Sequence, residues 1–268
     1  MIDIHSHILF GLDDGARSIE DSINIARKAV RDEIFQMVVT PHFFRGNFIH
    51  DNFRRVEERR EQLAQVLEEK KIPLDIFPGA EVHISHNLIS KIRQNREYLV
   101  LNHSSYMLVE FPSDHIFAGV KNLFYELLSE RITPIIAHPE RNSVFVRHPQ
   151  VLYDLVVMGS LVQSNAGSLT GIYGKGVQDA VRMFLNLKMV HFIGTDAHNI
   201  TTVPPLLSEA FHRAAEIIGL EDAKALVEDN PKAVIENKDI VNFPEPVVPE
   251  RKGKKLKIRF PSFFKNWK

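Results

Sequence analysis

The pattern of apolar and polar positions predicts an alternation of short strands and amphipathic helices along most of the chain. Seven short, mostly continuous apolar runs are typical of strands: Ile2–His5, Gln36–Thr40, Leu74–Pro78, Tyr106–Glu110, Pro134–Ala137, Leu161–Gln163 and Val190–Gly194. Charged stretches with apolar residues at helical spacing separate them, at Ile19–Arg31, Asn52–Lys71, Phe117–Ser129, Gly176–Leu187 and Leu206–Ile218. Apolar strands that alternate with helices indicate a parallel sheet covered on both faces. We therefore expect an α/β fold, either a barrel or an open doubly wound sheet.

Composition narrows the class of protein without identifying it. The chain has 268 residues, of which 44% are hydrophobic and 25% are charged, as in soluble globular proteins. It has no apolar stretch near the ~20 residues of a membrane span, and we expect no signal peptide. The absence of cysteine excludes disulfides, thiolate metal sites and cysteine nucleophiles. These features favour a cytoplasmic protein.

The net charge of -1 conceals a strongly basic C-terminal segment. Residues 251–268 contain lysines, arginines and aromatic residues but no acid, and the proline-rich stretch Pro244–Pro249 precedes them. We therefore predict a domain over residues 1–243 and a connector with a basic-aromatic tail over 244–268. Such a tail suits an anionic membrane surface, which would place the protein at the inner membrane face. An acidic partner, nucleic acid or a solvated tail are the alternatives, and of these we do not expect nucleic acid.

Histidines and carboxylates follow the ends of the predicted strands. They are His5, His7, Asp14, His42, Glu81, Glu110, His138, Asp196 and His198. Because the carboxyl ends of parallel strands converge on one face of a barrel, we expect these side chains to meet. Each motif alone has an ordinary structural explanation, such as a helix cap at Asp196. Their recurrence at most strand ends indicates a common site.

The residue types at these strand ends suit divalent metal ions. Imidazole and carboxylate groups bind first-row ions, and His5 and His7 point to the same side of their strand. A carboxylate such as Glu81 can bridge two ions, which together can clamp a phosphoryl group and activate a water molecule. Arg141 lies three residues past His138 and could bind the phosphate. We do not expect His83 and His86, which follow Glu81 closely in the sequence, to be ligands.

At these residues the sequence resembles the PHP (polymerase and histidinol phosphatase) superfamily. More narrowly, it is similar to the bacterial manganese-dependent tyrosine-protein phosphatases of capsular and exopolysaccharide gene clusters. The resemblance covers roughly residues 1–240. The matching segments are Ile2–Ile8, Asp13–Gly15, Gly79–Glu81, Ile136–Arg141, Thr195–Asn199 and Asp229–Pro231.

The resemblance implies a distorted (β/α)7 TIM-like barrel with a cluster of three metal ions. The implied ligands are His5, His7, Glu81 and Asp196 for one ion, Glu81, Glu110 and His138 for a second, and Asp14, His42 and His198 for the third. The implied catalytic residues are Arg141, Asp14 and His42, with Arg141 binding the phosphate. The implied ion is Mn²⁺, although Fe, Zn and Mg suit the same ligands. The implied substrate is a phosphotyrosine-bearing protein, namely a membrane-associated tyrosine kinase that controls polysaccharide export.

The chain departs from the family pattern in one respect. Related phosphatases carry a second arginine shortly after the last metal histidine, whereas residues 199–204 contain none. We therefore hypothesise that Arg45 supplies the second guanidinium. Other functions stay open at this point: a phosphatase for a small metabolite such as histidinol phosphate, an amidohydrolase, or a catalytically weak metal-binding module that regulates a kinase. No lysine stands at a strand end to support an amidohydrolase.

Overall fold

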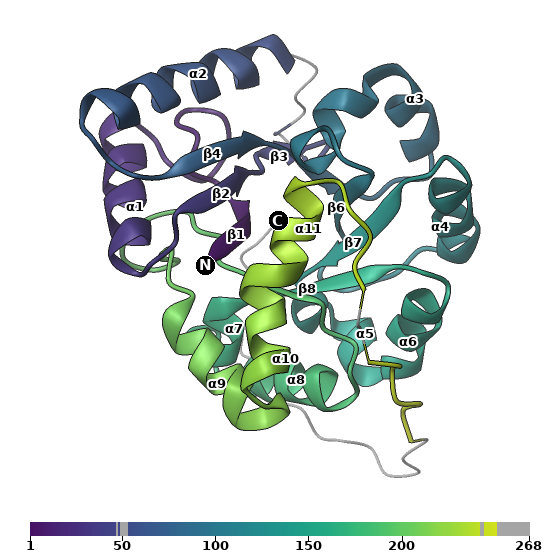
Figure 1. Ribbon diagram of the computed structural model, residues 1–268. Coiled ribbons are helices and arrows are strands. Elements are labelled where there is room, and N and C mark those ends of the chain that lie inside the picture. The colour runs from purple at the N-terminus through teal and green to yellow at the C-terminus, as the bar shows by residue number, and fades with distance from the viewer. Residues whose placement is uncertain (47, 49–52, 242–243, 251–268) are drawn as a thin grey trace.

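The computed structural model describes residues 1–46, 48, 53–241 and 244–250 (Figure 1). The basic tail at 251–268, and with it the prediction of membrane contact, lies outside these residues. Within the described ranges, no helix has both the length and the apolar character that crossing a membrane requires. Figure 1 shows the helices arranged around a central set of strands, with α11 (Asn230–Ile235) lying across the middle of the view.

All seven apolar runs form parallel strands. The strands β1 (Ile2–Ser6), β2 (Gln36–Val39) and β4 (Asp75–Pro78) form one sheet. The second sheet contains, in order, β3 (His42–Phe43), β5 (Glu81–His83), β6 (Tyr106–Glu110), β7 (Thr133–Ala137), β8 (Leu161–Asn165) and β9 (Phe192–Gly194). Ser6, the last residue of β1, pairs with Ala197, three residues past the end of β9, and His7 N donates to Ala197 O at 2.9 Å. The segment that follows β9 is therefore hydrogen-bonded to the carboxyl end of β1.

The second and third predicted strands cross from one sheet into the other. Two residues separate β2 from β3, and one of them, Pro41, has no backbone N–H for a ladder. Two residues also separate β4 from β5, where a side chain on Gly79 would approach Val38 Cγ1 to 2.6 Å. The short strands β3 and β5 then carry His42 and Glu81 into the second sheet. The interruptions thus decide where two of the candidate ligands are placed.

The predicted helices are present with small shifts at their ends. They are α1 (Ile19–Arg31), α2 (Phe53–Glu69), α4 (Val120–Ser129), α8 (Lys175–Asn186) and α9 (Ser208–Ile218). Helix α1 begins at a capping box formed by Ser18 and Asp21. The sequence pattern missed shorter or less regular helices, which are α3 (Leu88–Leu99), α5 (Ser143–Arg147), α6 (Pro149–Val157), α7 (Ala166–Thr170) and α10 (Leu220–Lys224). It also missed α11, the 3₁₀ turns Leu101–His103 and Pro139–Arg141, and the π-helical turn Ala225–Asp229.

Two clusters of buried apolar side chains stabilise this arrangement. The larger one lies between the strands and the helices and includes Ile25 of α1, Leu63 of α2 and Phe184 of α8. The smaller one joins strands of both sheets, with Ile4 and Leu108 among its members, to α11 and other segments. Because both sheets contribute to it, they share one interior.

The start of the connector packs against the domain. Residues 244–250 form neither helix nor strand, and Val247 N donates to Leu187 O at 2.9 Å. Pro244 lines a cavity of about 390 Å³ next to α8 and α9. The domain boundary at 243/244 stays a prediction.

Candidate metal centre at the carboxyl ends of the strands

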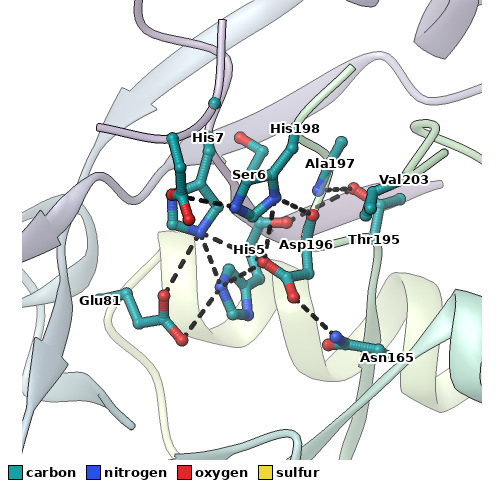
Figure 2. A network of polar contacts seen from close by, with 12 residues as sticks. His5, Ser6, His7, Glu81, Asn165, Thr195, Asp196, Ala197, His198 and Val203 are labelled. Atoms are coloured by element: carbon teal, nitrogen blue, oxygen red, sulfur yellow. Dashed lines mark hydrogen bonds and ion pairs between the residues drawn. The ribbon is translucent and has the colours of Figure 1, made fainter. Parts of the chain in front are cut away.

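The first set of predicted ligands meets in the buried centre shown in Figure 2. His5 Nε2 lies 3.4 Å from Glu81 Oε1 and 3.3 Å from Asp196 Oδ1. His7 Nε2 lies 3.3 Å from Glu81 Oε2 and 3.2 Å from Asp196 Oδ1. One ligand atom from each of these four buried residues lies within 4.8 Å of the other three. This spacing allows all four to coordinate a single ion.

A second group of ligand atoms shares Glu81. It combines Glu81 with Glu110, at the end of β6, and with His42 of β3. His138, which the resemblance places with Glu110, points its Nε2 at Glu81 Oε1 from 2.8 Å. The structure therefore groups Glu81 and Glu110 with His42, and it places His138 against the shared Glu81.

The third predicted set is also assembled. Asp14 Oδ1 lies 3.3 Å from both His42 Nε2 and His198 Nε2, and His7 completes a group of four. The Asp14 side chain is 35% exposed, in contrast to the fully buried Glu81. The centre therefore opens toward solvent on the side of Asp14.

Local backbone geometry places these side chains. The loop after β1 returns close to His7, where a side chain on Gly15 would approach His7 O to 2.1 Å. His138 and Asp196 adopt φ angles of 31° and 53°, in the left-handed region that non-glycine residues seldom occupy. Strained backbone of this kind is maintained only where surrounding contacts enforce it, and it clusters at functional sites.

Polar residues outside the predicted set orient the histidines. Asp13 Oδ2 accepts a hydrogen bond from His7 Nδ1 at 2.8 Å, which leaves Nε2 as the nitrogen that faces the centre. Gln163 Oε1 lies 2.8 Å from His5 Nδ1, and Gln163 Nε2 donates to Asn165 Oδ1. Since the Gln163 amide nitrogen is engaged there, its oxygen accepts from His5, whose Nε2 also faces the centre.

These supporting residues were only partly visible in the sequence. Asn165 Nδ2 donates to Asp196 Oδ2 at 2.8 Å, which links the end of β8 to the centre. Gln163 and Asn165 are polar residues two positions apart at the end of an apolar strand, and this is the signal that could have identified them. Asp3 accepts hydrogen bonds from the backbone and side chain of Thr195 and so ties β1 to the segment that carries Asp196.

The electrostatics of the centre hold its carboxylates in the charged form. Burial raises the pKa of Glu81, but His5 and His42 outweigh burial and leave it well below the ordinary value. Burial lowers the pKa of His7, but the charge of Asp13 and its hydrogen bond outweigh burial and leave it well above the ordinary value. Burial is likewise opposed by neighbouring imidazoles, with a net lowering of the pKa, at Asp13, Asp14, Glu110 and Asp196.

Several candidate ligand atoms are buried without a hydrogen bond in the described part of the chain, as expected of atoms that bind a cation. His42 Nδ1 and Glu81 Oε2 lie 2.8 Å apart, yet neither atom makes a hydrogen bond within the described residues. His198 Nε2 is likewise buried without one in that part of the chain. Buried polar atoms are costly when unsatisfied, and metal ions bound in the centre would satisfy all three. The donor set of imidazole nitrogens and carboxylate oxygens suits such an ion.

Two arginines lie at the edge of the centre. Arg141 Nη1 donates to Asp196 Oδ2 at 2.8 Å, and its side chain is 19% exposed. Arg45 Nη1 donates to His42 Nε2 at 2.6 Å, and Arg45 Nε lies 3.4 Å from Glu110 Oε2. Both positively charged groups therefore contact candidate metal ligands.

The two histidines that we did not expect as ligands, His83 and His86, lie outside the three groups of ligand atoms. His83 Nδ1 lies 3.2 Å from Glu110 Oε2. His86 packs its ring against Phe117, with centroids 4.2 Å apart. His83 therefore contacts one candidate ligand, whereas His86 makes an aromatic contact with Phe117.

Parallel strands whose carboxyl ends gather imidazoles, carboxylates and arginines define a class of metal-binding α/β proteins with a hydrolase-like site. Solved structures of low identity share the fold, including a lactonase from Listeria monocytogenes at 14% identity and a TM-score of 0.58, covering 89% of this chain and 95% of that one. The chain belongs to the CpsB/CapC family of capsular polysaccharide synthesis, whose model matches residues 1–236.

Individual relatives agree with this assignment. The chain is 37% identical over 252 residues to the tyrosine-protein phosphatase YwqE of Bacillus subtilis, covering 94% of this chain and 98% of the relative. It is 31% identical to the tyrosine-protein phosphatase CpsB of Streptococcus pneumoniae, covering 88% and 98%. A solved structure from a study of YwqE and CpsB, which are described as metal-dependent tyrosine phosphatases, matches with a TM-score of 0.87 and 36% identity, covering 94% of this chain and 100% of that one.

Proposed function

We propose that this protein is a metal-dependent phosphatase that removes phosphate from protein phosphotyrosine. The observation that carries the proposal is the convergence of three ligand groups in one centre, with Arg141 and Arg45 at its edge. Relatives at 31–37% identity that carry the name tyrosine-protein phosphatase support the choice of substrate class.

We assign the ligands to three ions as the resemblance implies; the first and third sets lie within observed groups of ligand atoms, and the contact of His138 with Glu81 supports the second. The sets are His5, His7, Glu81 and Asp196, then Glu81, Glu110 and His138, then Asp14, His42 and His198. Mn²⁺ is the proposed ion, and Fe, Zn and Mg suit the same donors. Ions bound here would supply Lewis acidity and lower the pKa of a bound water molecule to about 7.

The rest of the chemistry falls to residues of the chain. Arg141 and Arg45 bind the phosphate through charge-assisted hydrogen bonds and offset its charge. Phe48 stacks on His42 with ring centroids 5.7 Å apart and an interplanar angle of 19°. Its ring offers an aromatic face beside the centre, and this supports a phenyl phosphate as the group that enters.

The test is hydrolysis of a phosphotyrosyl peptide by protein stripped with a chelator and reloaded with Mn, Zn, Fe or Mg. We expect one metal to restore turnover, His138→Ala to abolish it, and the surface variant His212→Ala to retain it. Histidinol phosphate is assayed in parallel. Turnover of histidinol phosphate alone would refute the protein substrate. Metal binding without turnover of either compound would refute the phosphatase and favour the alternative, a metal-binding module that regulates a kinase.

We further propose that the phosphotyrosine lies on a membrane-associated tyrosine kinase that controls polysaccharide synthesis or export. The family's description as capsular polysaccharide synthesis supports this partner. In this setting the enzyme acts in the cytoplasm, and the tail at 251–268 contacts the inner membrane face. The test compares the full chain with residues 1–250 for sedimentation with anionic vesicles. Binding by the full chain alone, with equal peptide turnover by both, would support the contact.

We also propose that the strands close into the distorted (β/α)7 barrel. Counting β2 with β3, and β4 with β5, as single interrupted strands leaves seven units that follow one another in order. The pairing of Ser6 with Ala197, together with the Asp196 N to His5 O hydrogen bond of 2.8 Å, supports closure between the first and last unit.

A further inference from the structure

Tyr173 lies against the arginine that we assign to the phosphate. The Arg141 Cζ atom is 5.1 Å from the centroid of the Tyr173 ring. A guanidinium within about 6 Å of an aromatic face is attracted to it electrostatically. Tyr173 comes from the loop between α7 and α8, whereas Arg141 follows β7, so the contact joins two segments distant in sequence.

The loop that carries Tyr173 is tightly constructed. Gly171 and Gly174 adopt φ angles of 91° and 87°, which favour glycine. Ile172 N donates to Gly167 O at 2.8 Å, and Gly174 N donates to Gly171 O at 3.0 Å. A side chain on Gly167 would approach Tyr173 Cε2 to 3.2 Å, so the ring packs directly on α7. These contacts fix the ring on the side of Arg141.

Contacts with Asp196 and Tyr173 are among those that hold Arg141. One amino group donates to Asp196, and the guanidinium carbon lies over the Tyr173 ring. A guanidinium has five N–H donors in a rigid plane, so fixing the plane aims the other donors. Burial raises the pKa of the Tyr173 hydroxyl, so the ring stays neutral and does not repel a phosphate.

We propose that Tyr173 is a positioning residue that holds the Arg141 guanidinium in the orientation that binds the substrate phosphate. The proposal rests on the phosphatase function above. It assigns Tyr173 an indirect role in phosphate binding, through Arg141. It predicts that loss of the aromatic ring weakens phosphate binding and leaves the metal ligands in place.

The experiment compares Tyr173→Leu with Tyr173→Phe in the metal-loaded enzyme. Cation–π contacts are worth about 0.5–2 kcal/mol, so Tyr173→Leu is expected to lower kcat/KM for a phosphotyrosyl peptide by about 2- to 30-fold, mainly through KM. The inhibition constant of inorganic phosphate should rise by the same factor, with unchanged metal content. Tyr173→Phe, which keeps the ring, should restore both values. Tyr125→Leu, at an exposed tyrosine of α4, controls for the substitution itself.

A double-mutant cycle then separates positioning from general packing. If Tyr173 acts through Arg141, Tyr173→Leu should have almost no further effect on phosphate affinity in an Arg141→Gln background. An equal loss in both backgrounds, or an equal loss in Tyr173→Phe, would overturn the proposal. Calorimetric binding of inorganic phosphate provides the same cycle without turnover. Failure of the wild-type enzyme to hydrolyse the peptide would therefore refute the proposed function but leave the role of Tyr173 measurable.

Discussion

The carboxylate of Asp13 offers the sharpest test of how the centre is supported. Its side chain is fully buried. Asp13 is not one of the proposed metal ligands, but it forms hydrogen bonds with residues that are. Asp13 Oδ2 accepts from His7 Nδ1 at 2.8 Å and from His42 N at 3.1 Å, while Oδ1 accepts from Gly15 N at 3.0 Å. Asp13→Asn keeps the shape of the side chain but replaces one acceptor oxygen with a donor NH₂ group.

The structure sets the size of the effect. Both carboxylate oxygens of Asp13 accept hydrogen bonds from N–H groups. In Asp13→Asn the side-chain NH₂ group must therefore face one of these N–H groups, so that hydrogen bond is lost. A hydrogen bond lost from a buried charged group costs about 1.5–3 kcal/mol. Part of that loss falls on the orientation and basicity of His7, and removal of such outer contacts typically weakens metal binding or activity by about 10- to 100-fold.

The assay titrates Mn²⁺ into chelator-stripped protein and follows both bound metal and peptide turnover. Asp13→Asn should shift the metal dependence to higher concentration by at least about 10-fold and recover much of its turnover at saturating metal. Asp179→Asn makes the same change at an exposed residue of α8 and should match the wild type. A metal dependence for Asp13→Asn within about 2-fold of wild type would refute the supporting role.

Three further predictions follow from single sites. Burial lowers the pKa of His191 to about 3. Between pH 6.5 and 3 the His191 ring is therefore protonated in the unfolded chain but stays neutral in the folded protein. His191 should therefore cost about 2 kcal/mol of stability on going from pH 7 to pH 5, and His191→Asn should show a smaller loss in urea unfolding of the metal-free protein; equal losses would contradict this. Gly15→Ala should destabilise the fold by about 3 kcal/mol in thermal unfolding, because its Cβ would lie 2.1 Å from His7 O. Gly119→Ala is the comparison, because a Cβ there contacts no other atom of the described residues and causes only backbone strain. Arg45→Ala should raise KM for the peptide by about 10-fold if Arg45 binds phosphate, and unchanged kinetics would exclude that role.

Much of the candidate site could be predicted because it depends on one topological fact. The carboxyl ends of parallel strands share one face, so polar residues that directly follow apolar runs must gather there. His5, Glu81, Glu110, His138 and Asp196 were recognisable on this basis. The periodicity of the chain likewise predicted the strands and the long amphipathic helices, since both patterns reflect local geometry.

Other features depended on strand register and loop packing, which local patterns do not encode. Pairing of β8 with β9 places Asn165 opposite Gly194, near Asp196, and this register follows from the packing of both strands. Tyr173 reaches Arg141 only because two glycine-rich turns fold its loop onto α7. The grouping of His42 with Glu110 depends in the same way on where the second strand is interrupted.

The sequence by itself therefore determined which residues could carry the chemistry and at which end of the sheet they lie. The tertiary structure decided which nitrogen of each histidine faces the centre, which neighbours hold it there, and which side opens to solvent. The physical reason is that strand and helix periodicity arise from contacts between near neighbours. Side-chain orientation at a buried polar centre arises instead from hydrogen bonds between segments as distant as His5 and Gln163.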